Sequence, residues 1–422
     1  MILRVLHDSR YLTIKMDVFD KYYHTYRIIL KIIGLWPYNN SIYVWIQRLL
    51  LLTFYLIVSL LKSEIMLQNC ILILSTICPL VIISLRYICF IVFFPMIKYL
   101  FHHIRMEENI IQDSIEKRIR TKCINDSCHM IEILLRMLYA TIAFYSMFIL
   151  YLVISDFMMP LNESLIRILR YVTLFSVNRI IYFYILCLDI LFVVIFGLLS
   201  IICTESIIGL CSYHTSILFK IISYRIQKII TYLTIVNLSS KQIDSKLTEL
   251  YRVVDMHNQA IKLIDVIINN SGKQFMVSTL LFVISMAINL YRLVNAIIIK
   301  KDQLEISISL IFFVNQFIIM FLCNHSGQIL IDNSQKLFDE LYISVWYFVP
   351  LKVQKILLLI MIRSSMTCMF HILGVFIPCH IGFSKVICLN KHIIIVLIQI
   401  NENSCISDNK IDDIVLDVLV LK

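Results

Sequence analysis

Residues 137–155 read MLYATIAFYSMFILYLVIS and contain no charged side chain. A helix needs about 20 mainly apolar residues to cross the hydrocarbon core of a bilayer. Inside that core every backbone polar group must find its partner within the segment, which an α-helix achieves by itself. This stretch therefore predicts a membrane-crossing helix.

Five further stretches are long and apolar enough to cross a bilayer as helices, at 43–61, 70–94, 180–203, 275–298 and 306–323. The 422-residue chain is 60% hydrophobic and 16% charged, with a mean hydropathy of +0.85. Soluble domains are about 45–50% apolar and about 25% charged, so this chain lacks the polar surface to cover itself. Its seven Gly and six Pro favour long, uninterrupted helices. The composition predicts an all-α membrane protein embedded in a lipid bilayer.

The distribution of Lys and Arg predicts the orientation. The first 42 residues hold six, and the connections 95–136 and 204–274 hold seven and eight. The alternate connections 62–69, 156–179 and 299–305 hold one, three and two. Because Lys and Arg accumulate in cytoplasmic connections, we expect a cytoplasmic N-terminus. The charges at Arg4, Asp8, Arg10 and Lys15 also exclude a signal peptide at the start of the chain.

This topology accounts for other features of the composition. The net charge of +10 follows from the positive connections and does not call for a nucleic-acid partner. Of six Asn-x-Ser triplets, the one at Asn162 lies in an external connection and is a glycosylation candidate. Cys123, Cys128 and His129 have zinc-binding side chains, but their spacing fits no standard zinc pattern. We expect neither metal nor cofactor.

Two cytoplasmic segments have helical periodicity. In 204–274, apolar residues recur three or four positions apart at Leu250, Val253, Val254, Ile261, Ile264 and Ile268. We expect the fourth and fifth helices to project below the bilayer and pack together there. After the sixth span, the apolar stripe Leu330, Leu337, Leu341, Val345 and Phe348 predicts one amphipathic helix that ends at Pro350.

Four segments resemble insect odorant receptors. The sequence YISVWYFVPLKVQKILLLIMIRSS at 342–365 resembles the C-terminal signature of that family, and KIIGLWPY at 31–38 its N-terminal Gly-Leu-Trp-Pro segment. VVDMHNQAIKLIDVIINN at 253–270, which includes His257, is similar to the segment leading into the fifth helix. HILGVFIPCHIGFSKVI at 371–387 is similar to the turn before the last span. The resemblance covers roughly residues 20–387, in order and spacing.

The resemblance implies a seven-helix bundle whose topology is inverted relative to G-protein-coupled receptors. It implies a subunit of an odorant-gated non-selective cation channel, assembled with an odorant co-receptor as a heterotetramer in the plasma membrane of sensory neuron dendrites. Cytoplasmic ends of the helices would form an anchor between subunits, in which Tyr342, Trp346, Tyr347 and Arg363 are the expected assembly residues.

The expected organisation has six parts. A cytoplasmic N-terminal segment (1–42) precedes transmembrane helices one to four (43–203) and a cytoplasmic helical extension (204–274). Helices five and six (275–323) are followed by the cytoplasmic helices of the anchor (324–381), and the chain ends in an atypical last span and polar tail (382–422).

In such receptors a small volatile hydrophobic ligand binds in the outer half of the bundle, where shape and dispersion provide selectivity. The candidate ligand-binding residues are Phe148, Tyr151, Tyr182, Tyr184 and Phe312. Two charges fall within the spans, Arg86 and Asp189, and should face the protein interior or a wet cavity. They could pair, or Asp189 could be protonated. Asn289, Arg292 and Asn295 recur on one face of the fifth helix and are expected to face a polar interior.

The C-terminus departs from the family. The apolar core of the last span, Ile393–Ile400, is about eight residues, and Lys391 and His392 interrupt its extension upstream. A truncated last helix and a non-conducting receptor product therefore remain alternatives, as does a gustatory receptor of the same superfamily. A G-protein-coupled receptor would need an external N-terminus, which the distribution of Lys and Arg argues against. A transporter would be expected to show inverted repeats, and none is visible in the sequence. No Gly-rich phosphate loop, HExxH or nucleophile elbow suggests an enzyme.

Overall fold

The computed structural model describes residues 18–39, 41–51, 70–111, 113–158, 179–235, 240–300 and 303–404. Within some of these helices, including residues 179–194 of α9, only the backbone is described. This part of the chain is helical, and its one pairing of extended backbone is a single bridge between Ile372 and Phe376. The all-α class expected from the composition is confirmed.

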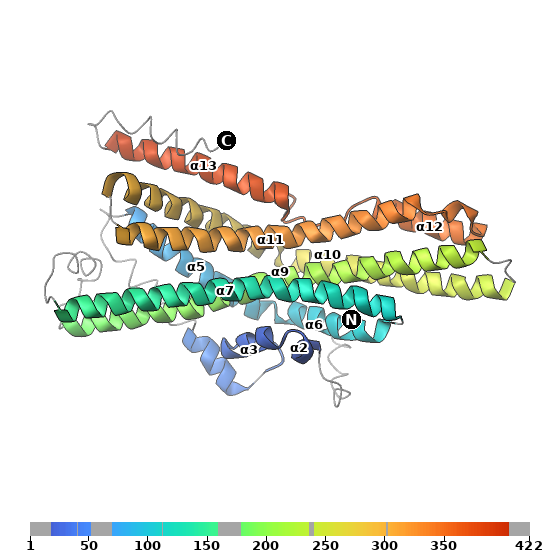
Figure 1. Cartoon of the computed structure of the whole chain (residues 1–422), viewed down its shortest axis with the longest axis horizontal. Coiled ribbons are helices and arrows are strands. Elements are labelled where there is room, and N and C mark those ends of the chain that lie inside the picture. The colour runs from blue at the N-terminus through green and yellow to red at the C-terminus, as the bar shows by residue number, and fades with distance from the viewer. Residues whose placement is uncertain are drawn as a thin grey trace.

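Four long helices run along the longest axis of the molecule (Figure 1). They are α7 (Ser114–Met158), α9 (Arg179–Ile235), α10 (Ser240–Asn295) and α11 (Gln303–Ile343). Each is long and apolar enough to cross a membrane. Together they contain the spans predicted at 137–155, 180–203 and 306–323, and the span predicted at 275–298 runs from α10 into the short π-helix η2 (Ala296–Lys300). At about 1.5 Å per residue they are all longer than a bilayer core of about 30 Å. They therefore project beyond it, as expected for the fourth and fifth helices.

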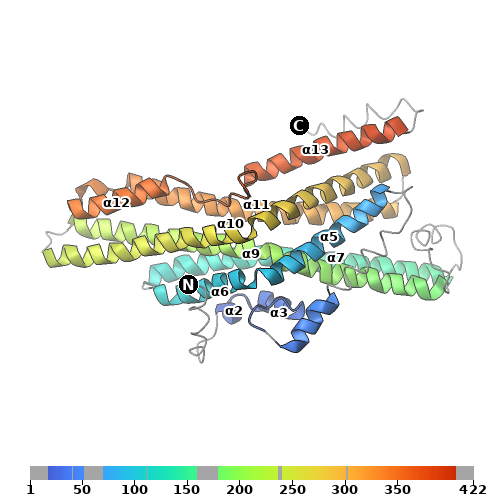
Figure 2. The same ribbon diagram turned by 180° about the vertical axis from the view of Figure 1, so that it is seen from behind.

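A bent pair of helices contains the span predicted at 70–94. α5 (Cys70–Val92) and α6 (Phe94–Ile110) meet at Phe93, where the chain bends by 67°. Pro95 lies in the first turn of α6, and a proline ring at this position cannot continue the preceding helix without a clash. Figure 2 shows α5 passing beside α10 on the face opposite to α7. Of the predicted first span, 43–61, the described part is the short helix Ile42–Leu51.

The N-terminal segment folds back onto the bundle. α2 (Val18–Lys21) and α3 (His24–Ile32) lead into a turn at Gly34, whose φ of +77° suits glycine. The Tyr26 hydroxyl donates to the Cys203 carbonyl at 2.8 Å, and that of Tyr87 donates to the Ile33 carbonyl at 2.8 Å. Buried rings of Phe19, Trp36 and Phe101 pack against each other. α3, Ile33 and the Gly-Leu-Trp-Pro segment thus together fasten the N-terminal segment to α5, α6 and α9.

The end of the molecule beyond the spans is built from the lower halves of α9, α10 and α11 together with α12 (Leu351–Ser364) (Figure 1). Leu250, Val253, Ile261 and Ile264 are buried there, as the periodicity of α10 predicts. We refer to this region as the lower helical domain.

One prediction in this domain is wrong. The amphipathic helix after the sixth span does not continue to Pro350, because α11 ends at Ile343 and a 3₁₀ turn, η3 (Trp346–Phe348), follows. Pro350 is instead the N-cap of α12, and Val349 before it is extended, as a residue preceding proline prefers. Leu330, Leu337 and Leu341 are buried, but the predicted stripe is broken at Val345 and Phe348, which are exposed.

The last helix is longer than its apolar core suggests. α13 (His380–Ser404) has 25 residues and continues through Lys391 and His392. Both side chains are exposed, so they do not disturb the backbone hydrogen bonds of the helix, while Ile394 on another face is buried. α13 packs along α10 and α11 (Figure 1). The apolar core Ile393–Ile400 is therefore only part of a longer helix, and its eight residues do not set the length of α13.

Candidate functional site

The half of the helical bundle that lies away from the lower helical domain, which we call the upper bundle, contains a row of aromatic rings between α7 and α11. The ring of Tyr145 lies edge-on to that of Phe312, with centroids 6.2 Å apart, and to that of Phe144 at 5.6 Å. Phe144 in turn lies parallel to Phe148 at 6.5 Å. We call Phe144, Tyr145, Phe148 and Phe312 the upper aromatic cluster. It brings two of the predicted ligand residues, Phe148 and Phe312, into one group.

Tyr145 is the polar member of this cluster. Its side chain is buried, and its hydroxyl makes no hydrogen bond with the described residues. A buried hydroxyl without a partner costs about 1–3 kcal/mol. A ligand that accepts a hydrogen bond from Tyr145 would therefore be stabilised in this cluster. Sequence reasoning missed Tyr145 because every face of the charge-free span 137–155 is apolar. Its offset of three residues from Phe148, one helical turn, is the signal that could have found it.

Of the other predicted ligand residues, only Tyr151 has a described side chain, and it does not join the cluster. Tyr151 is 58% exposed, on a different face of α7 from Tyr145. The side chains of Tyr182 and Tyr184 on α9 lie outside the described residues, as does all of Asn162.

A layer of amide and hydroxyl side chains lies next to the aromatic rows. The Asn315 amide donates to Thr141 Oγ1 at 2.9 Å, which joins α11 to α7. Gln316 donates to Ser285 Oγ at 2.8 Å, and Asn289 donates to Gln316 Oε1 at 3.3 Å, which joins α11 to α10. The prediction that the fifth helix turns a polar face inwards is confirmed for Asn289, which is buried.

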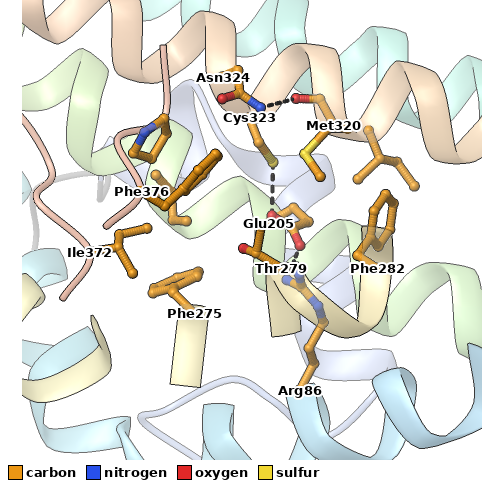
Figure 3. A pocket seen from close by; sticks show the side chains of 13 residues that line it. Arg86, Glu205, Phe275, Thr279, Phe282, Met320, Cys323, Asn324, Ile372 and Phe376 are labelled. Carbon is orange, nitrogen blue, oxygen red and sulfur yellow. Dashed lines mark hydrogen bonds and ion pairs between the residues drawn. The ribbon is translucent and has the colours of Figure 1, made fainter. Parts of the chain in front are cut away.

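Arg86 forms an ion pair with Glu205 in the interior of the helical bundle (Figure 3). Both side chains are buried, and the Cys323 thiol donates to the second Glu205 oxygen at 2.8 Å. The pair links α5 to α9, and the thiol adds α11. Arg86 therefore faces the interior as expected, but its partner is Glu205. Glu205 was not predicted as the partner because it lies just beyond the predicted fourth span, 180–203. The side chain of Asp189, the partner considered from the sequence, lies outside the described residues.

A small cavity of about 30 Å³ adjoins this ion pair. Its walls come from α5, α9, α10, α11 and the connection between α12 and α13, and they include Phe275, Phe282 and Phe376 (Figure 3). One water molecule needs about 10–15 Å³ in such a measure. The cavity therefore has room for one or two water molecules. We call it the central cavity.

The connection before α13 is docked on α11. The backbone N–H groups of Cys379 and His380 donate to the side-chain oxygens of Asn324 and Gln328, at 3.1 and 3.2 Å. These donors belong to the N-terminal end of α13, where no intrahelical partner exists. A Cβ atom at Gly327 would lie 2.1 Å from the Pro378 carbonyl oxygen. Because glycine has no side chain, the backbone at Pro378 can lie directly against α11 at Gly327.

The joint between α11 and α12 presents apolar side chains at the surface of the chain. Tyr342 and Phe348 are 67% and 71% exposed, and Tyr347 and Leu351 are exposed beside them. We call these four residues the lower aromatic surface. Trp346 is half-buried and lies edge-on to Tyr347, and Arg363 is exposed on α12. Tyr342 and Tyr347 contact neighbouring rings of the same joint, but most of their surface stays exposed.

His257 lies inside the lower helical domain. Its ring is buried and edge-on to Phe219, with centroids 6.0 Å apart. Burial, and then the positive charge of Arg363, lower the pKa of His257 from 6.5 to about 4. The imidazole is consequently neutral at physiological pH.

The thiols that resemble metal ligands have other partners. Lys220 donates to Cys123 Sγ at 3.2 Å, and Cys128 donates to the Tyr22 carbonyl at 3.2 Å. Over the described residues, no group of three His, Cys, Asp or Glu side chains is arranged to hold a metal ion.

Comparison with known families decides the identity. The family model described as 7tm Odorant receptor matches residues 69–386, which is most of the chain. The chain belongs to the seven-transmembrane odorant receptor family. This membership confirms the resemblance seen in the sequence. The family comprises multi-pass membrane receptors for odorants and is not an enzyme class.

Solved odorant receptors have the same fold. The olfactory receptor OR5 of Machilis hrabei in complex with eugenol matches with a TM-score of 0.72 at 12% sequence identity. A second structure of OR5 matches with a TM-score of 0.65 at 12% identity. Each match covers 90% of this chain and 98% of the other. No curated protein sequence matches the chain. The seven-helix odorant receptor fold is thus present despite low identity.

Proposed function

We propose that this odorant receptor is the ligand-binding subunit of an odorant-gated non-selective cation channel. It assembles with a co-receptor into a heterotetramer in the plasma membrane, with its N-terminus in the cytoplasm. The observation that carries the proposal is the lower aromatic surface. Tyr342, Tyr347, Phe348 and Leu351 expose apolar area on the lower helical domain, which would lie outside the bilayer in this topology. Contiguous apolar area outside the lipid marks a protein-binding site.

The upper aromatic cluster supports the ligand part of the proposal. Aromatic and aliphatic walls with few polar groups suit small volatile molecules. The related OR5 receptor was solved with eugenol, a molecule with an aromatic ring and oxygen acceptors. We infer a ligand of this class for the present chain, with its apolar body against Phe148 and Phe312 and its acceptor at the Tyr145 hydroxyl.

Electrophysiology with a co-receptor tests the channel. We expect odorant-evoked cation currents when the two chains are expressed together, and surface delivery that depends on the co-receptor. Phe348→Ser and Tyr347→Ala should reduce co-purification with the co-receptor at least several-fold. Tyr251→Ala is the matched control, because Tyr251 is similarly exposed on α10 but lies outside the lower aromatic surface. Co-purification that is unchanged in both test variants would refute the assembly surface.

A glycosylation tag tests the orientation. A tag inserted before residue 20 should stay unmodified if the N-terminus is cytoplasmic, whereas Asn162 should be accessible to glycosylation. The reverse pattern would contradict the proposed topology.

A non-conducting receptor product is the second candidate. The exposed Lys391 and His392 in the middle of α13 favour it, because charges facing lipid are costly. Odorant binding and co-receptor assembly without current, with current restored by an apolar replacement at both positions, would select this candidate.

A further inference from the structure

Arg86, which lines the central cavity, has a buried nitrogen without a hydrogen-bond acceptor among the described residues. Arg86 is 5% exposed, and one of its terminal nitrogens pairs with Glu205. Its Nε is buried and has no hydrogen-bond partner among the described residues. Nearly all buried polar groups in proteins are paired, and leaving a charged group short of a partner is costly. The site therefore calls for an acceptor next to Arg86.

The surroundings supply further polar groups. The Glu205 carboxylate accepts from the Cys323 thiol and from Arg86, but two carboxylate oxygens together can accept about four hydrogen bonds. The Thr279 hydroxyl also lines the cavity. A buried water molecule requires about two to four polar partners, and Arg86, Glu205 and Thr279 provide that number from three helices.

The size of the cavity selects the ligand. Its volume of about 30 Å³ accommodates water. Phe275, Phe282 and Phe376 form apolar walls around the polar groups (Figure 3). We propose that the central cavity binds one or two ordered water molecules, which complete the hydrogen bonds of Arg86 and connect it to Glu205 and Thr279.

The position of this water site gives it a structural role. Phe376 and Pro378, in the connection docked on α11 before α13, form one wall. The water molecules would hold the ion pair between α5 and α9 together with α10, directly beneath this connection. The inference concerns the resting receptor and does not depend on the identity of the odorant.

Radiolytic hydroxyl-radical labelling with mass spectrometry tests the site, because ordered water next to a side chain promotes its oxidation. The full-length chain in lipid nanodiscs is exposed to short X-ray pulses. Met320 lines the cavity and is 6% exposed, whereas Met130 is 5% exposed and lies elsewhere in the core, so it is the matched control. We expect Met320 to be oxidised at least several-fold faster than Met130.

Filling the cavity should remove this difference. In Thr279→Leu, and independently in Ile208→Phe, oxidation of Met320 should fall to the rate of Met130. An unchanged Met130 rate and an unchanged elution profile establish that each variant is folded. Equal rates for Met320 and Met130 in the natural chain would overturn the proposal, as would fast Met320 oxidation that persists in a folded, filled variant. Density for water within about 3.2 Å of Arg86 Nε in a high-resolution structure would support it directly.

Discussion

Arg225 on α9 and Glu116 on α7 form a bidentate ion pair, with Nε 2.7 Å from Oε1 and Nη2 2.8 Å from Oε2. Both side chains are buried. The geometry fits a guanidinium and a carboxylate with two parallel hydrogen bonds. The pair fixes the start of α7 against the projecting part of α9, and so orients the third span relative to the lower helical domain.

Removing one partner of this pair should destabilise the receptor. Arg225→Met removes the bidentate partner of the buried Glu116 carboxylate, and breaking a buried ion pair in this way costs about 3–5 kcal/mol. The double variant Glu116→Leu with Arg225→Met should recover most of the loss, since both charges of this pair are then removed. Thermal unfolding followed by fluorescence-detected gel filtration measures both. Lys228→Met is the control, because it removes an exposed pair with Asp113 on the same two segments and should change little. A single variant as stable as the natural chain would contradict this account.

Tyr145→Phe should change the response to odorants selectively. If the hydroxyl donates to the ligand, its loss removes about 0.5–1.5 kcal/mol, which weakens oxygen-containing odorants up to about tenfold. Purely apolar odorants should be unaffected or bind slightly better. Concentration–response curves for matched pairs of odorants measure this. Tyr139→Phe is the control, since Tyr139 is exposed on the same helix. Equal shifts for both odorant classes would argue against a hydrogen bond from Tyr145.

Acidification should destabilise the lower helical domain through His257. Its pKa is about 4 in the folded chain and about 6.5 when unfolded. The unfolded chain therefore binds more protons, and stability falls as pH drops from about 6.5 to about 4. The contribution is about 2 kcal/mol between pH 7.5 and pH 5. Thermal unfolding at the two pH values should show a smaller difference in His257→Gln. Arg363→Met should also reduce it, because losing that charge raises the pKa of His257. An identical pH dependence in all three chains would disprove the assignment.

Gly327→Ala should disrupt the docking of α13 on α11. The new methyl group would lie 2.1 Å from the Pro378 oxygen and 2.9 Å from its carbonyl carbon. Because both atoms belong to the backbone, the connection must move, at a cost of about 1–3 kcal/mol. Limited proteolysis between residues 366 and 380 should accelerate. Gly272→Ala is the matched control within α10, where the nearest atom is 3.9 Å from the added carbon. That change should be neutral or stabilise by about 0.5–1 kcal/mol. Equal protease resistance in both variants would show that the approach at Gly327 is not tight.

Much of the fold could be predicted because its signals are local. The charge-free run at 137–155 and the spacing of Leu250, Val253 and Ile264 each need a single helix to be interpreted. The end of α11 at Ile343 was missed because the apolar stripe continues through Val345, although the chain turns there to make Pro350 the N-cap of α12. At the site, Phe148 and Phe312 were found by residue type, while Tyr145 and Glu205 depend on contacts between helices.

The sequence by itself determined the membrane class, the spans of the long helices and the family, because hydropathy, helical periodicity and short motifs are properties of neighbouring residues. Only the tertiary structure decided that Arg86 pairs with Glu205 and that Tyr145 contacts Phe312. It also decided that the side-chain oxygens of Asn324 and Gln328 accept hydrogen bonds from the N-terminal end of α13. These contacts join residues from different helices. Their formation depends on which faces of those helices meet, and no single stretch of the chain encodes that choice.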